Sequence, residues 1–169
     1  MNRLLIFSLL FVVTLQAQNK SRMVTDEKSG GQMLTGISDR PVFSDTTFSW
    51  WFNSEYEGYK VKIKDLDGVK EKIKDFDITI VMAAWCGDSR REIPRFYKIL
   101  DSLEYPSDKI KLIMVDRKKK DPSGEADSLK IRFIPTIIFY NGKTEAGRII
   151  EAPKETLETD IHNIIFGTE

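Results

Sequence analysis

The pattern of apolar and polar positions first marks a hydrophobic N-terminus. Leu4 to Leu15 are nearly all apolar and follow a short positive start, which is typical of a secretory signal peptide. The run is short for a membrane span, which needs about 20 apolar residues. We therefore predict that residues 1–18 are a signal peptide and that the protein is exported, to a periplasmic or extracellular location. A retained signal anchor is the alternative. A bacterial lipid anchor is excluded, because no cysteine stands directly after the apolar run to carry it.

Residues 19–59 show weaker patterning and are interpreted as an N-terminal extension. Residues 19–41 are polar with little apolar periodicity, which predicts a loose arm. Residues 42–59 are rich in aromatic side chains that alternate loosely with polar ones, which predicts a strand or an arm packed on the domain. A binding groove lined by these rings is the alternative to such packing.

Residues 60–169 are expected to form one compact domain. Alternation or continuous apolar runs predict strands at residues 59–66, 78–84, 109–116, 135–140 and 146–152. Apolar residues at helical spacing predict helices at residues 67–76, 88–103, 126–131 and 154–167. Asn141-Gly142 is a strong hairpin signal between the last two strands. This order predicts an α/β fold with a central mixed sheet flanked by helices on both faces.

Composition restricts the chemistry. Acidic and basic residues number 26 each, so no overall field favours nucleic acid. No second apolar stretch is long enough for stable membrane insertion after signal cleavage. The basic run within Asp116–Asp121 is interpreted as a solvated loop that could help to dock an acidic partner. Cys86 is the only cysteine, so any disulfide must form with another molecule. His162 is the only histidine and is expected on the surface of the last helix, so no metal site or cofactor is predicted.

The segment around Cys86 carries the candidate chemistry. "WCGDS" (Trp85–Ser89) follows a buried strand and opens a helix, and Pro94 lies eight residues after the cysteine. "IPT" (Ile134–Thr136) leads into a strand, and "NGK" stands at the hairpin turn. In this order the features resemble the thioredoxin superfamily over roughly residues 60–166. Within it they are similar to extracytoplasmic thioredoxin family proteins that carry a single-cysteine WCGDS motif.

The resemblance implies a thioredoxin-like fold in which Pro135 is cis and faces Cys86. It also implies that the backbone beside this proline pairs with an extended substrate peptide, so Ile134 and Thr136 would contact substrate. The other expected substrate-binding residues flank the cysteine and are Trp85, Gly87 and Asp88.

Three departures from the family pattern bear on function. Ser89 stands in place of the second cysteine, and Ile80 replaces the buried acid that thioredoxins carry six residues before the first cysteine. That acid assists proton transfer when the second thiol attacks a mixed disulfide, so the two losses agree with each other. The glycine usual in the last strand is also replaced, near Ile150.

Cys86 retains the first half of disulfide exchange. A helix N-terminus offers free N–H groups and about half a positive charge, which favours the nucleophilic thiolate. Arg90 and Arg91 are expected to favour it, Asp88 to oppose it, and Ser89 to donate a hydrogen bond to the sulfur. We therefore predict a monothiol thiol–disulfide oxidoreductase or isomerase whose catalytic residues are Cys86 and Ser89. Its substrates would be protein or low-molecular-weight thiols and disulfides, with an external reductant or resolving thiol.

Three alternatives stay open. A lone cysteine after a buried strand is often a small packed hydrophobe. The fold also serves as a binding or chaperone-like module, which would use the groove at Pro135 without redox chemistry. "CGDS" is also similar to the CGFS of monothiol glutaredoxins, which hold a 2Fe–2S cluster with glutathione, although Trp85 and the signal peptide argue against that role.

Overall fold

The computed structural model describes residues 21–168, so the signal peptide predicted for residues 1–18 lies outside the described part of the chain. The strands form one six-stranded sheet in the order β1-β2-β4-β3-β5-β6. Their bounds are β1 Arg22–Thr25, β2 Gln32–Ser38, β3 Phe76–Met82, β4 Ile110–Met114, β5 Thr136–Asn141 and β6 Thr144–Ile150. β3 and β4 run parallel, whereas the other neighbouring pairs are antiparallel. The mixed sheet predicted from the sequence is therefore confirmed.

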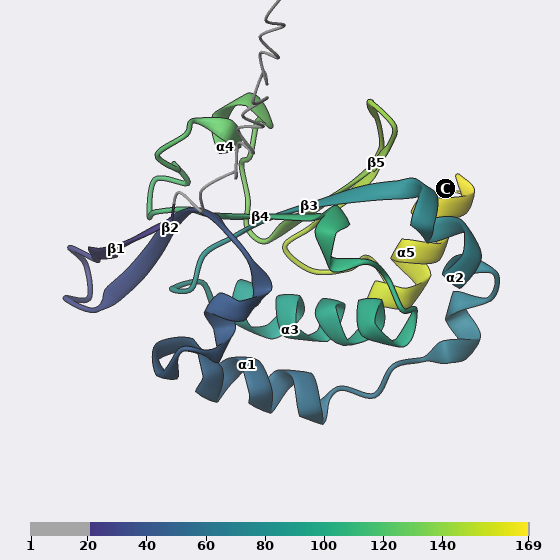
Figure 1. Ribbon diagram of the computed structural model, residues 1–169, viewed down its shortest axis with the longest axis horizontal. Coiled ribbons are helices and arrows are strands. Elements are labelled where there is room, and N and C mark those ends of the chain that lie inside the picture. Colours follow the sequence, from purple (N-terminus) through teal and green to yellow (C-terminus); the bar gives the residue numbers. More distant parts are fainter. Residues whose placement is uncertain (1–20, 169) are drawn as a thin grey trace, which may run out of the picture.

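Helices lie on both faces of this sheet. Within the described residues the α-helices are α1 Thr46–Gly58, α2 Val69–Lys72, α3 Gly87–Ser102, α4 Glu125–Ser128 and α5 Leu157–Phe166. In Figure 1, α3 and α5 lie on one face, and α1 packs on the outer side of α3. The short α4 lies on the opposite face, near β4. The predicted α/β architecture is confirmed, with most of the helical cover on one face.

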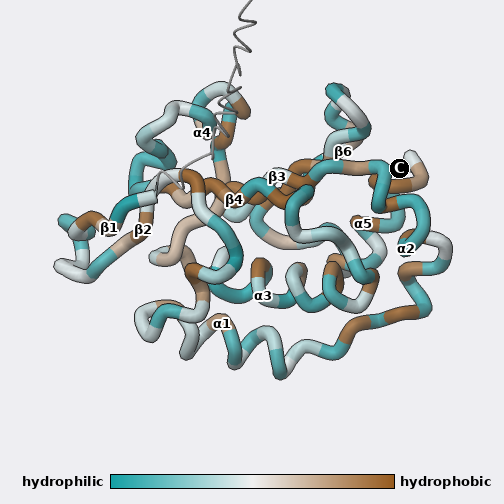
Figure 2. The backbone as a smooth tube through the Cα atoms, in the orientation of Figure 1, coloured by the Kyte–Doolittle hydropathy of each residue, from teal (hydrophilic) through white to brown (hydrophobic). Residues whose placement is uncertain are grey.

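The central strand β3 contributes to a core on each face of the sheet, which explains its continuous apolar sequence. Ile78, Ile80 and Met82 of β3 belong to the larger core, which they share with α1, α3 and α5. Val81 points to the other face and packs in a smaller core with Ala126 of α4. Figure 2 shows the concentration of hydrophobic residues along β3 and β4. Strands buried on both faces need apolar residues at every position, which is the pattern the sequence shows.

Most of the aromatic stretch at residues 42–59 is helix α1, which packs against α3, so the predicted packing on the domain is confirmed and the strand is wrong. Asp45 caps α1 by accepting a hydrogen bond from the N–H of Thr47 at 2.8 Å. The helix buries one stripe of rings at a spacing of three and four: Phe48, Trp51 and Phe52. Trp50 interrupted this pattern in the sequence, because its side chain lies outside the buried stripe and is 65% exposed.

Residues 22–38 form a hairpin, followed by a 3-10 helix from Arg40 to Ser44, so the prediction of a loose arm over residues 19–41 was wrong for the described part. β1 pairs with β2, and β2 pairs in turn with β4, where Gly36 lies opposite Met114. The turn is closed by Asp26, whose N–H donates to the Gly31 carbonyl and whose carbonyl accepts from the N–H of Gly30, both at 2.8 Å. The pairing partner of β2 lies far along the chain, and local periodicity carries no signal for such a contact.

The edge strand predicted at residues 59–66 is also wrong. The segment contains a short 3-10 helix, η2 (Ile63–Leu66). It is anchored to α5, because the buried carboxylate of Glu158 accepts hydrogen bonds at 2.9 Å from the Tyr59 hydroxyl and from the Lys62 N–H. These tertiary contacts override the local alternation. The helix predicted at 67–76 is shorter than expected and consists of α2 followed by the 3-10 helix η3 (Ile73–Asp75).

The remaining predicted elements are confirmed to within a few residues. They are the strands β3, β4, β5 and β6 and the helices α3, α4 and α5. Gly147 of β6 allows α5 to approach closely, since a Cβ at this position would lie 2.9 Å from the side chain of Ile164. No helix within residues 21–168 has the length and apolarity that crossing a membrane requires.

Candidate active site

Cys86 stands at the start of α3, after the turn that follows β3. It is the N-cap residue, and its carbonyl accepts the first helical hydrogen bond from the N–H of Arg90 at 3.0 Å. The Cys86 N–H donates to the Ala83 carbonyl at 3.1 Å, which closes the turn. The side chain is partly exposed at the positive end of the helix.

The loop that precedes β5 faces Cys86. The Cys86 thiol donates to the carbonyl oxygen of Ile134, with 3.4 Å between Sγ and the oxygen. The Ile134–Pro135 peptide bond is cis, and the Pro135 carbonyl accepts from the N–H of Glu151 at 2.7 Å. Phe133, which leads into this loop, is 50% exposed. The structure thus brings two of the sequence-predicted site residues into contact and adds Phe133, which the sequence analysis missed.

Two further residues shape this loop. Thr136 is buried, and its hydroxyl donates to the Phe133 carbonyl at 2.7 Å, so its side chain is engaged within the protein. Glu151 follows Ile150 and has a φ of 60°, a left-handed conformation that glycine adopts most easily. The exposed side chain next to the cis peptide bond is therefore that of Phe133.

Ser89 lies one turn into α3 and is fully buried. Its hydroxyl oxygen accepts a hydrogen bond from the N–H of Ala83 at 3.3 Å. A hydrogen bond from this hydroxyl to the sulfur was predicted from the sequence, whereas the Cys86 thiol pairs with Ile134. Ile80 is fully buried in the larger core. These two positions thus hold a hydroxyl and an alkyl group where the family pattern has a thiol and a carboxyl group.

The charges next to Cys86 partly neutralise one another. Arg91 Nη2 lies 2.8 Å from Asp88 Oδ1, and Arg91 Nε lies 2.5 Å from Glu92 Oε1. Hydrogen bonding to Glu92 raises the pKa of Arg91 above its usual value. The opposing influences predicted for Arg91 and Asp88 on the thiol therefore largely cancel.

A groove of about 300 Å³ runs between α1 and the start of α3. Its lining residues are Trp50, Trp51, Ser54, Glu55, Gly87, Arg90 and Arg91. Arg90 donates through Nε to the Ala84 carbonyl, and its guanidinium carbon lies 5.8 Å from the centre of the Trp50 ring. Open space surrounds the position where Gly87 would carry a side chain. Helix α1 therefore supplies an aromatic wall beside the start of α3, which the strand interpretation of its sequence could not reveal.

Trp85 is held by a cluster that the sequence analysis missed. Its indole N–H donates to the Val115 carbonyl at 3.3 Å, and the guanidinium carbon of Arg117 lies 4.5 Å from its ring centre. Asp26 holds Arg117, with 2.5 Å between Nη2 and Oδ2 and 3.0 Å between Nε and Oδ1. The Asp26–Arg117 pair depends on the β1–β2 hairpin. In the sequence, the turn-forming residues of "DEKSGG" (Asp26–Gly31) are the signal that could have indicated this hairpin.

We predict that the fold loses stability in acid because of the ion-paired carboxyl group of Asp26. Hydrogen bonds from Arg117 and then from the Ser29 hydroxyl hold the pKa of this buried carboxyl well below its usual range. Its stabilising contribution is therefore fully present above about pH 4, the ordinary Asp value, and is lost as the pH falls through the lowered pKa.

The expected result is a higher melting temperature for the wild type than for Asp26→Asn at pH 7, with the gap shrinking steadily below about pH 4. Thermal melts followed by circular dichroism from about pH 7 to about pH 2 measure it. A gap that keeps its size over this range would contradict the prediction.

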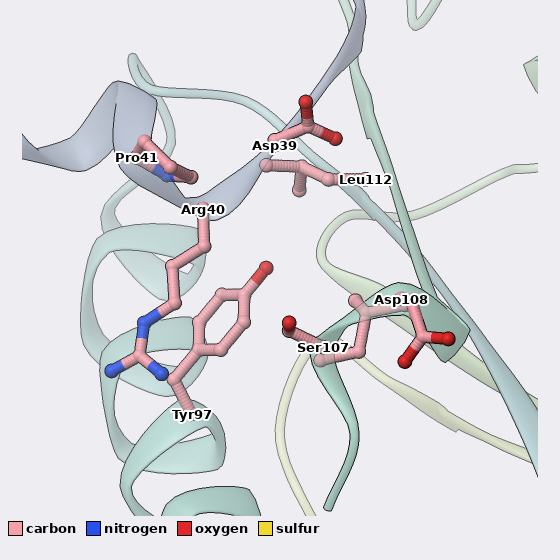
Figure 3. A pocket seen from close by; sticks show the side chains of 8 residues that line it. Asp39, Arg40, Pro41, Tyr97, Ser107, Asp108 and Leu112 are labelled. Carbon is pink, nitrogen blue, oxygen red and sulfur yellow. The ribbon is translucent and has the colours of Figure 1, made fainter. Parts of the chain in front are cut away.

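A second cavity, of about 320 Å³, lies away from the thiol. In Figure 3 the Tyr97 ring projects into it beside Arg40, whose guanidinium carbon is 4.9 Å from the ring centre. Tyr97 lies about three turns beyond Cys86 on α3, roughly 16 Å along the helix axis. Burial raises the pKa of the Tyr97 hydroxyl, so it stays protonated. This cavity is separate from the site at Cys86.

The fold and this site define a thioredoxin-like protein, and sequence comparison identifies the family. The model of the thioredoxin family matches residues 51–162. The chain therefore belongs to the thioredoxin family. It is 28% identical over 103 residues to Thioredoxin Asp f 29 from Aspergillus fumigatus, a match that covers 59% of this chain and 90% of that protein.

Two solved structures are similar to the chain at low sequence identity. A protein of unknown function from Pseudomonas aeruginosa superimposes with a TM-score of 0.50 at 16% identity, covering 79% of this chain and 94% of that one. Mitochondrial thioredoxin 3 from Saccharomyces cerevisiae, in its oxidized form, has a TM-score of 0.34 and 21% identity, covering 50% of this chain and 76% of that one. The likeness to the Pseudomonas protein concerns the fold alone.

Proposed function

We propose that the protein carries out monothiol thiol–disulfide exchange through Cys86. The observation that carries this proposal is a partly exposed thiol at the N-cap of α3 that faces the Ile134 carbonyl at 3.4 Å. A cysteine that served only as a packed hydrophobe would not need exposure at the positive end of a helix. Membership of the thioredoxin family agrees with thiol chemistry at this position.

The proposed exchange has two steps that need no cofactor. The Cys86 thiolate attacks one sulfur of a disulfide, a new bond forms to Cys86, and the other half leaves as a thiolate. An external thiolate then attacks the mixed disulfide, takes the captured half into a new disulfide and restores the Cys86 thiolate. The protein gains and loses no electrons over the cycle, so it shuffles or transfers disulfides, and any net reduction comes from the external thiol. Ser89 supports the turn below Cys86 through its bond to Ala83.

The proposed substrates are protein or low-molecular-weight disulfides. An extended peptide would lie along the backbone at Ile134, with the exposed rings of Phe133 and Trp50 as further contacts. The open backbone at Gly87 gives access to the groove beside α1. We further propose that the protein acts outside the cytoplasm, where disulfides persist, on the basis of the apolar run at Leu4–Leu15.

A trapping experiment tests this function. The wild type incubated with oxidised glutathione or a disulfide-bonded peptide should form a mixed disulfide that persists until an external thiol is added. Cys86→Ser should form none, because a hydroxyl is not a nucleophile for disulfides. Intact-mass spectrometry measures the adduct, and circular dichroism checks that both proteins are folded.

Ser89→Ala is the matched control for this experiment. It removes the buried hydroxyl but keeps the thiol, so it should still form the adduct. If the wild type forms no adduct, or if Cys86→Ser keeps full activity in refolding a scrambled-disulfide substrate, the chain is a binding module without redox chemistry.

A further inference from the structure

We propose that Arg117, held by Asp26 of the N-terminal hairpin, is a positioning residue that fixes the Trp85 ring and favours the thiolate of Cys86. The inference rests on the proposed exchange chemistry of Cys86 and adds to it two residues that lie outside the sequence motif.

The Asp26–Arg117 pair is built as a rigid support. Asp26 is 2% exposed and accepts hydrogen bonds from the Ser29 hydroxyl at 2.6 Å and from the Lys28 N–H at 3.1 Å, in addition to those from Arg117. Two-point contact between a guanidinium group and a carboxylate fixes orientation as well as distance. The hairpin therefore delivers one arginine side chain in a defined position next to the sheet.

Arg117 connects this support to the thiol site. The guanidinium carbon of Arg117 lies 4.5 Å from the centre of the Trp85 ring. The indole N–H of Trp85 donates a hydrogen bond to the Val115 carbonyl, which also holds the ring. Trp85 and Cys86 pack side by side against the smaller core, which includes Ala83 and Ile134. Arg117 and Val115 thus hold the ring of the residue that immediately precedes Cys86.

The charge of Arg117 also acts on Cys86. Hydrogen bonding to Asp26 is the main reason that the pKa of Arg117 is raised, and the charge of Cys86 contributes to the same shift. The guanidinium group lies against the ring of Trp85, the residue that precedes Cys86, and a cation close to a thiol favours the thiolate form. Asp26 offsets part of this charge, which keeps the effect moderate. Arg91 is shared between two carboxylates, Asp88 and Glu92, whereas Arg117 pairs with one.

The rate at which iodoacetamide alkylates Cys86, measured from about pH 5 to about pH 9, tests the proposal. Arg117→Gln removes the charge and keeps a planar group, whereas Arg117→Lys keeps the charge. We expect Arg117→Gln to lower the rate at pH 7 by roughly three- to tenfold and to move the pH profile to higher pH. Arg117→Lys should recover most of the rate. If Arg117→Gln fails to fold, Arg117→Met takes its place in the comparison.

Arg40→Gln is the matched control. Arg40 also pairs with an aspartate at two points, at 2.6 and 2.7 Å from Asp101, and lies over the ring of Tyr97 away from Cys86. Its alkylation profile should equal that of the wild type. The proposal is overturned if Arg117→Gln stays within twofold of the wild type with an unchanged pH profile, or if Arg117→Lys is as slow as Arg117→Gln.

Alkylation needs no disulfide partner, so this experiment separates the two proposals. Slower alkylation of Arg117→Gln together with a wild type that forms no mixed disulfide supports the inference and removes the exchange function. Normal alkylation of Arg117→Gln together with mixed-disulfide formation by the wild type removes the inference alone.

Discussion

The Ser89→Cys variant is expected to release the captured half of a mixed disulfide without an external thiol, by forming an internal disulfide between positions 86 and 89. Residues three positions apart on a helix lie on the same side, so a thiol at position 89 would face Cys86 from one turn into α3. Attack within one molecule has an effective concentration far above that of millimolar external thiols. We therefore expect the lifetime of a preformed mixed disulfide to fall by at least about 100-fold. Acid quenching followed by intact-mass spectrometry measures that lifetime.

Ser102→Cys is the control for this variant. It adds a second thiol at the far end of the same helix, where the serine hydroxyl donates to the Ile99 carbonyl. The adduct on this variant should live as long as that on the wild type. If Ser89→Cys does not shorten the lifetime, or if Ser102→Cys shortens it equally, the absence of a second sulfur does not explain a persistent mixed disulfide on the wild type.

The elements near the thiol were predictable because each carries a strong local pattern. β3 lies in the middle of the sheet and reads as one apolar run, and α3 has a buried stripe that includes Ile93, Phe96 and Leu100. β5 and β6 are joined at an Asn-Gly turn, whose chemistry alone specifies a hairpin. The contact between Cys86 and Ile134 then follows from the order of these elements.

The N-terminal part could not be predicted in the same way, because long-range contacts determine its structure. β1 has only exposed or half-exposed residues, so its sequence lacks a buried face to detect. The buried aromatic residues of α1 can be recognised as a helical stripe only once Trp50 is known to be exposed. The Asp26–Arg117 pair depends on both the hairpin and the loop after β4, and no spacing along the chain joins them. The sequence therefore predicted the motif and missed the support around it.

Ile80→Asp is expected to destabilise the fold by roughly 3–5 kcal/mol near neutral pH. Ile80 is fully buried on β3, opposite Leu112 of β4 and Ile137 of β5, so an introduced carboxylate would lose water and alkyl contacts without gaining a partner. Burial raises the pKa of the introduced carboxyl group. The stability difference from the wild type should thus be smallest at about pH 4 and grow as the pH rises towards that raised pKa, the reverse of the dependence expected from the Asp26 carboxyl group.

Urea unfolding between about pH 4 and about pH 8 measures this effect, and Ile80→Asn is the control. Asparagine has nearly the same shape as aspartate but does not titrate, so its stability difference from the wild type should not follow the same pH dependence. Equal pH dependence of the two variants would mean that the carboxyl group does not titrate in the folded protein.

Ile80→Asp also tests whether the absence of the carboxyl group at position 80 and the absence of the second thiol at position 89 belong to the same change in function. The resemblance to thioredoxins implies that a carboxyl group at position 80 accepts the proton of an attacking second thiol, but it has nothing to activate when position 89 is a serine. Ile80→Asp added to Ser89→Cys should therefore shorten the mixed-disulfide lifetime beyond Ser89→Cys alone, whereas Ile80→Asp by itself should leave the lifetime of the wild-type adduct unchanged. The destabilisation is common to both backgrounds, so comparing them isolates the chemical effect. A lifetime shortened equally in both would show that the acid assists the external thiol instead, and the two losses would then be independent.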